Sequence, residues 1–166
     1  MKPEEIGILI VDDEASVRDS LCQWFKIDGY RADTAAEATG ALKKIQEDSW
    51  DIILLDIKMP GMNGIELQNR IKQIDKNIVT IIITAYATVD TAIQALKEGA
   101  FDYVTKPIDP DDLSRLIRNA IEQRRLVTEN IQLRQKIEEL LLPDEVVGES
   151  PSIKKVMEMV NTVAKT

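Results

Sequence analysis

Five short apolar segments, separated by stretches with helical spacing, constrain the fold of this chain most strongly. The segments are residues 6–11, 30–35, 51–56, 79–84 and 102–105. The first, third and fourth are almost continuous Ile, Leu and Val, which is typical of strands covered on both faces. Between the segments, apolar residues recur three and four positions apart, as in Ala92, Ala95, Leu96 and Gly99. This alternation predicts an α/β fold with an open, doubly wound parallel sheet between helices.

The pattern after the fifth segment predicts one long C-terminal helix. Asp109 is a good N-cap, and Pro110 suits the first helical position. No helix breaker follows until Pro143, so the helix could run for about 32 residues, or roughly 48 Å. Within this helix, residues spaced alternately four and three apart predict the seam of a coiled coil, in which Asn130 is the polar member. The seam residues are Leu126, Asn130, Leu133, Ile137 and Leu140. Two heptads leave a second interpretation open, in which the seam packs on a downstream domain.

Composition excludes several classes of function. The chain of 166 residues has a net charge of -8, which disfavours direct binding of nucleic acid. It contains no histidine, so it carries no histidine-based catalysis, histidine metal ligand or phosphohistidine. Its single cysteine, Cys22, excludes a disulfide within the chain. No apolar run approaches the roughly 20 residues of a membrane span, and no signal peptide is recognisable, so we expect a cytoplasmic protein.

Polar residues close the apolar segments at the ends where ligands bind in open parallel sheets. Asp12 and Asp13 follow the first segment, and Asp56 ends the third. Thr84 ends the fourth segment, and Lys106 follows the fifth. Because the carboxyl ends of parallel strands lie at one edge of the sheet, we expect these side chains to converge there.

The residue types at this edge predict a metal-assisted reaction of a phosphoryl group. Three carboxylates in a partly dry site repel one another, and a divalent cation removes that repulsion. Hard oxygen ligands with room for water favour Mg²⁺, and the turn after Asp56 would add the backbone carbonyl of Lys58. A carboxylate oxygen can then attack phosphorus and form an acyl phosphate, while Lys106 and Thr84 neutralise and position the phosphoryl group. Lys58 and Tyr86 border this site and could control access of water.

Four motifs, "ILIVDDE", "LLDIKMPGMNG", "IIITAYA" and "AFDYVTKP", together resemble the receiver domain of bacterial two-component response regulators over about residues 5–122. The resemblance implies a flavodoxin-like (βα)5 fold with strand order 2-1-3-4-5. It implies that Asp56 is the phosphoacceptor and that Asp12 and Asp13 join it around Mg²⁺. The phosphoryl donor implied is a histidine kinase, and the protein is then a signalling switch rather than an enzyme acting on another substrate.

The same resemblance assigns roles to residues around the phosphoacceptor. Thr84 and Lys106 would bind the phosphoryl group, and Thr84 and Tyr103 would form the switch. The bond before Pro107 is usually cis in this family. A homodimer would form through the face made by the fourth helix, fifth strand and fifth helix, together with the linker helix.

The tail "VVGESPSIKKVMEMVNTVAKT" resembles the opening of the AAA+ ATPase domain in sigma-54-dependent activators of the nitrogen-regulator type. The expected organisation is a receiver domain at 1–122, a coiled-coil-like linker helix at 123–143 and the start of a truncated AAA+ domain at 144–166. This implies missing ATPase and DNA-binding domains that act with the sigma-54 RNA polymerase.

Other interpretations of the same residues remain open. The acids after the first segment could simply cap a helix, Thr84 could finish a strand, and Lys106 could be a solvated loop residue. At the level of function, the alternatives are a receiver coupled to a different output, a Mg²⁺-dependent aspartyl-phosphate phosphohydrolase, and a dimerising adaptor with an idle acidic site.

Overall fold

A computed structural model of the chain describes residues 3–141 and contains a single five-stranded parallel sheet within that range. The strand order is β2-β1-β3-β4-β5, as the resemblance implied. All four neighbouring pairs are parallel. The strands are β1 (Gly7–Val11), β2 (Arg31–Ala35), β3 (Ile52–Leu55), β4 (Val79–Thr84) and β5 (Asp102–Thr105).

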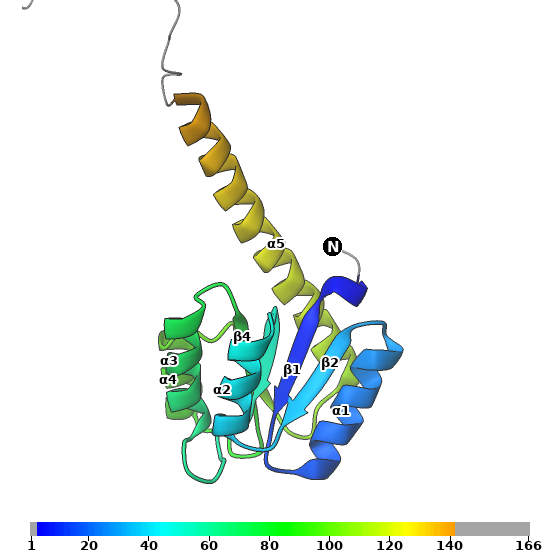
Figure 1. Cartoon of the computed structure of the whole chain (residues 1–166). Helices are drawn as coiled ribbons and strands as arrows, with labels where there is room; N and C mark the ends of the chain where they lie inside the picture. Colours follow the sequence, from blue (N-terminus) through cyan, green and yellow to red (C-terminus); the bar gives the residue numbers. More distant parts are fainter. Residues whose placement is uncertain (1–2, 142–166) are drawn as a thin grey trace, which may run out of the picture. The chain divides into compact units, whose positions relative to one another are not determined.

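Helices cover both faces of the sheet, as the predicted doubly wound layer requires (Figure 1). A short 3-10 turn, η1 (Pro3–Glu5), precedes β1. The helices are α1 (Ala15–Ile27), α2 (Ala38–Glu47), α3 (Gly64–Ile74), α4 (Val89–Lys97) and α5 (Pro110–Leu141). Residues of α2, α3 and α4 belong to the core on one face, and residues of α1 and α5 belong to the core on the other.

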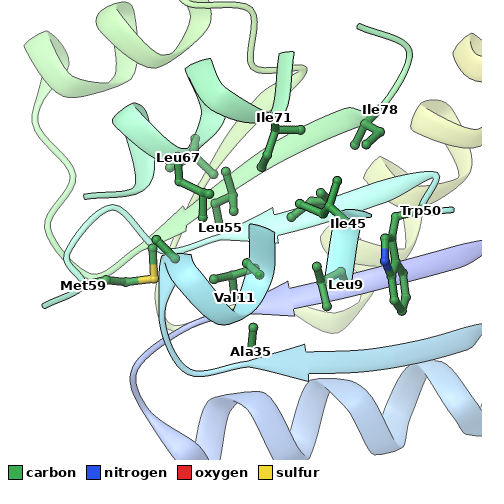
Figure 2. Packing of buried hydrophobic residues seen from close by; sticks show 14 of the residues in the cluster. Leu9, Val11, Ala35, Ile45, Trp50, Leu55, Met59, Leu67, Ile71 and Ile78 are labelled. Atoms are coloured by element: carbon green, nitrogen blue, oxygen red, sulfur yellow. The ribbon is translucent and has the colours of Figure 1, made fainter. Parts of the chain in front are cut away.

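Alternation along β1 explains why its sequence is continuously apolar. Leu9 and Val11 belong to the core under α2 and α3, whereas Ile8 and Ile10 belong to the core under α1 and α5. All four side chains are buried, so both faces of the strand require apolar residues. Figure 2 shows the first of these cores, with Leu9, Val11, Leu55 and residues of α2 and α3 packed together. Burying each such side chain contributes about 1.5–3 kcal/mol.

Local signals set the helix starts that border the carboxyl edge of the sheet. The Asn63 side chain accepts a hydrogen bond of 2.9 Å from the Glu66 amide and caps α3. Thr88 and Thr91 form a reciprocal capping box at the start of α4. Asp109 accepts a hydrogen bond of 2.8 Å from the Asp111 amide, so its predicted capping of α5 is confirmed.

The predicted long helix is confirmed, because α5 runs unbroken from Pro110 to Leu141. Residues 3–129 form one compact unit, and the described part of a second unit, 130–141, is the remaining segment of this helix. The apolar seam residues Leu126, Leu133, Ile137 and Leu140 are exposed. The expected helix end at Pro143 and the expected AAA+ segment at 144–166 lie outside the described residues. Among the helices of residues 3–141, none has the length and apolar character needed to span a membrane.

Candidate functional site

Three carboxylates meet at the carboxyl edge of the sheet, as the strand ends predicted. One oxygen from each of Asp12, Asp13 and Asp56 lies within 4.8 Å of the others. The Asp12 amide donates to the Ala35 carbonyl, and the Asp56 amide donates to the Val11 carbonyl, so both acids extend the sheet ladder. Asp12 and Asp56 are only 3% and 6% exposed, whereas Asp13 is exposed. Two buried acids and one that faces water therefore share a single small space.

Lys106 supplies the positive charge nearest to these acids. Its Nζ lies 2.7 Å from Oδ2 of Asp12 and 3.4 Å from Oδ2 of Asp56. A third carboxylate, that of Glu14, lies 3.3 Å from the same nitrogen. The peptide bond between Lys106 and Pro107 is cis, as the resemblance led us to expect. The expected convergence of Lys106 on the acids is therefore present in the structure.

The acidic side chains at this edge outnumber the one lysine that pairs with them. Burial raises the pKa of Asp12 above its ordinary value of 3.8, and hydrogen bonds from Lys106 and the Glu14 amide only partly offset this. Burial alone would lower the pKa of Lys106, but the hydrogen bond and charge of Asp12 and the charge of Asp56 raise it above 10.5. Lys106 is therefore protonated at neutral pH, and the acids retain excess negative charge around one shared cation.

The donor set fits Mg²⁺. It offers three hard carboxylate oxygens close together, on a site that is open to water on the Asp13 side. A divalent cation would also relieve the cost of burying ionised Asp12 and Asp56. The Lys58 amide donates to Oδ1 of Asp56 over 3.2 Å, which places the following turn directly beside the carboxylates.

Thr84 ends β4, and Tyr103 lies near the start of the neighbouring strand β5. Thr84 is fully buried at the end of β4, and its Oγ1 accepts a hydrogen bond of 3.2 Å from the Tyr86 amide. The Thr84 carbonyl accepts from the Lys106 amide over 2.9 Å, which links the two strand ends. The Tyr103 ring packs partly buried against the core, and its hydroxyl lies 3.4 Å from Oγ1 of Thr91 in α4.

Some residues that shape the site were not identified from the sequence. The Arg18 guanidinium donates to the backbone carbonyls of Asp12 and Asp13 over 2.7 and 2.9 Å. A Cβ on Gly64 would lie 2.2 Å from the Asp56 carbonyl oxygen, so only glycine permits α3 to start this close to the acid. The "MNG" at the start of α3 marks a helix start, but nothing in it predicts the distance to Asp56.

The Lys58 side chain lies over the ring of Tyr86, with Nζ 3.4 Å from the ring centroid. This cation–π contact joins the two residues that the sequence placed at the border of the site. It connects the turn after β3 to the turn after β4.

Comparisons with known proteins agree with this geometry. Residues 8–118 match the family described as Response regulator receiver domain. The chain is 36% identical over 164 residues to the transcriptional regulatory protein ZraR of Klebsiella oxytoca, covering 99% of this chain and 36% of that protein. The chain spans about a third of the length of the first curated relatives it matches.

Two solved structures are also similar. The beryllofluoride-activated NtrC4 receiver domain dimer is 36% identical, with a TM-score of 0.68, and the match covers 71% of this chain and 98% of that one. NtrX from Brucella abortus in complex with ADP is 27% identical, with a TM-score of 0.68, and the match covers 96% of this chain and 34% of that one. Because the family match includes both acidic strand ends and more than half of the chain, this protein belongs to the response regulator receiver domain family of two-component systems.

Proposed function

We propose that Asp56 accepts a phosphoryl group from a partner histidine kinase and that this chain acts as the switch of a transcription activator. The observation that carries the proposal is the cluster of three carboxylate oxygens within 4.8 Å, with Lys106 bridging Asp12 and Asp56. Acids with a purely structural role are commonly paired one to one with cations, whereas here Asp12, Asp56 and Glu14 share Lys106. Chain geometry and the family together favour phosphoryl transfer.

In the proposed reaction an Asp56 oxygen attacks phosphorus while the bond from phosphorus to the kinase histidine nitrogen breaks. The product is an acyl phosphate on Asp56 and a neutral histidine on the kinase. When bound by Asp12, Asp13, Asp56 and the Lys58 carbonyl, Mg²⁺ supplies charge neutralisation for the phosphoryl oxygens. The Lys106 ammonium, already 3.4 Å from Asp56, binds a phosphoryl oxygen, and the Thr84 hydroxyl donates to another.

The proposed conformational response starts at Thr84. To reach the phosphoryl group its hydroxyl leaves the Tyr86 amide, and Tyr103 moves into the space that Thr84 vacates. Movement of Tyr103 breaks its contact with Thr91 at the capped end of α4. The face formed by α4, β5 and α5 is then remodelled, and a homodimer changes through this face and the linker helix.

Exposed apolar side chains support this face as an interface. Val89, Ile93 and Leu96 are exposed on α4. The similar NtrC4 receiver domain is described as an activated dimer. On α5, Leu133, Ile137 and Leu140 give the second unit an exposed apolar seam of its own.

The proposed domain organisation is a receiver at 1–122, a linker helix at 123–143 and the start of an AAA+ domain at 144–166. The match to NtrX, which was solved with ADP, extends over nearly all of this chain and supports an ATPase that follows. The output is then that of a sigma-54-dependent activator, with DNA binding carried by domains beyond this chain. A cytoplasmic location belongs to the same proposal, since its output acts on transcription.

Phosphorylation is tested by incubating the chain with a small acyl phosphate and Mg²⁺ and measuring intact mass. We expect one phosphoryl group per chain on the wild type and none on Asp56→Asn. Asp33→Asn, which removes an acid of β2 that pairs with Lys44, is the matched control and retains labelling. Continuous release of phosphate from a phosphate monoester would instead favour the phosphohydrolase and contradict the proposal.

The dimer is tested by sizing the chain with and without beryllofluoride as phosphoryl mimic. We expect the assembly to change with the mimic, and Leu133→Lys with Ile137→Lys to lower the dimer fraction at least tenfold. Ile27→Lys, at an exposed apolar position on α1, is the control and leaves assembly unchanged. A chain that stays monomeric under all conditions would assign the seam to a downstream domain instead.

A further inference from the structure

A cavity at the amino edge of the sheet, away from Asp56, has an unusual lining. Its volume is about 340 Å³, and it lies between α3, the start of β4, the α4–β5 turn and α5, all within residues 3–129. Three cationic side chains line it, those of Lys72, Lys76 and Arg124, and no acidic side chain does. Although the chain has a net charge of -8, all the charged residues that line this cavity are cations.

Two of these cations form no ion pair with the residues that the structure describes. Within residues 3–141, Lys72 and Lys76 form no ion pair, whereas Arg124 binds Asp51 over 2.6 Å. The partly buried Lys72 ammonium donates to the Ile78 carbonyl over 2.5 Å, which leaves two of its protons for other acceptors. Burial lowers the pKa of Lys72, and the nearby charge of Asp75 only partly offsets this.

Thr80 provides an independent sign of a missing ligand. Its side chain is fully buried, its hydroxyl has no hydrogen-bond partner, and it lines the same cavity. The surrounding strand is otherwise Val and Ile up to Thr84, and a valine would occupy nearly the same space without leaving a polar atom unpaired. The polar residues Asn77 and Gln123 also line the cavity.

We propose that this cavity binds a phosphate-class oxyanion, either inorganic phosphate or the phosphate group of a small phosphorylated molecule. Lys72 and Lys76 provide the charge, and the Thr80 hydroxyl donates to one oxygen of the anion. The anion then connects α3 and β4 to the part of α5 that carries Arg124. This proposal does not depend on phosphorylation of Asp56, which lies at the opposite ends of the strands.

Binding of inorganic phosphate to the full chain is measured by calorimetry and by NMR shifts, without Mg²⁺ and against chloride at matched ionic strength. We expect saturable binding to the wild type, equal binding to Asp56→Asn, and at least tenfold weaker binding to Lys72→Met. Lys76→Gln changes an exposed side chain, so it tests the site without risk to folding, and it weakens binding severalfold. Thr80→Val folds at least as well as the wild type and also binds more weakly.

Lys43→Gln is the control, because Lys43 is an exposed lysine of α2 outside the cavity, and it binds like the wild type. A second titration with glycerol phosphate distinguishes the two sources, since tighter binding than inorganic phosphate indicates a phosphorylated molecule. Absence of saturable binding to the wild type, or binding that Lys72→Met, Lys76→Gln and Thr80→Val leave unchanged, would overturn the proposal. Loss of binding in Asp56→Asn would move the anion to the carboxyl edge and overturn it equally.

Discussion

Two buried acids at opposite edges of one sheet, Asp51 and Asp12, have very different surroundings. Asp51 accepts a hydrogen bond of 2.7 Å from the Gly7 amide and pairs with the Arg124 guanidinium at 2.6 Å. Asp12 shares Lys106 with Asp56 and Glu14, and Asp13 lies within the same cluster. The difference teaches that burial alone does not mark a functional acid. An acid paired with its own cation stabilises the fold. Acids that share one cation keep a net negative charge, which a bound ligand can neutralise.

The largest effect on stability is expected from Asp51→Ala. Removing this acid leaves the Arg124 charge and the Gly7 amide without their partner in a partly buried place, at a cost of about 3 kcal/mol. Urea unfolding measures this loss, and labelling of Asp56 in the folded fraction stays as in the wild type. If a folded Asp51→Ala chain were no longer labelled on Asp56, Asp51 would also contribute to phosphorylation and the two edges would not differ in role.

Gly64→Ala should have the next largest effect, and it should act on the site. Its Cβ would lie 2.2 Å from the Asp56 carbonyl oxygen, so α3 and the Asp56 backbone must shift, at a cost of about 1–3 kcal/mol. The rate of labelling falls because the acid is displaced from its partners. Gly40→Ala is the control, since its Cβ would meet only Ala35 Cβ at 3.9 Å, and it leaves stability and labelling rate unchanged or slightly higher. Equal behaviour of the two variants would show that the close approach is unimportant.

A smaller effect of opposite sign is expected from Asp12→Asn. Because the surroundings raise the pKa of Asp12, its ionised form is less favourable in the folded chain than in the unfolded chain. Neutralising it without Mg²⁺ therefore increases the free energy of unfolding at neutral pH, while labelling slows. Asp51→Asn in parallel should be destabilising. If Asp12→Asn and Asp51→Asn destabilise the fold equally, the negative charge of Asp12 is already neutralised by Lys106, contrary to this account.

The pH dependence of stability gives the finest comparison. A folded-state pKa raised above 3.8 means that the stabilising contribution of protonated Asp12 is fully present below 3.8 and is lost as pH rises through the folded pKa. The difference in unfolding free energy between wild type and Asp12→Asn should therefore grow over that interval and then level off. A difference independent of pH would show that Asp12 titrates alike in both states.

Much of the fold could be predicted because continuous apolar segments alternate with stretches of helical spacing along this chain. The acids of the site were found for a related reason: Asp12, Asp13 and Asp56 directly follow buried strands, and parallel strands bring their ends together. The strand order came from the resemblance, because spacing alone does not tell which strands are neighbours.

The remaining features depend on side chains that meet across large separations in sequence. Nothing near Arg124 indicates that it pairs with Asp51, and nothing near Thr80 indicates that its hydroxyl lacks a partner. Leu96 shares the helical spacing of Ala95, but Ala95 is buried and Leu96 is exposed. The spacing of apolar residues shows how wide the apolar face of a helix is. It does not show how much of that face packs against the sheet.

The most direct measurement maps the phosphoryl group after reaction with an acyl phosphate, in Mg²⁺ and in chelator. Proteolysis and fragmentation of the labelled chain should place the group on Asp56, only when Mg²⁺ is present. A label on another residue, or equal labelling of Asp56 with and without the metal, would contradict the account that clustered acids at the carboxyl edge gather a cation for phosphoryl transfer.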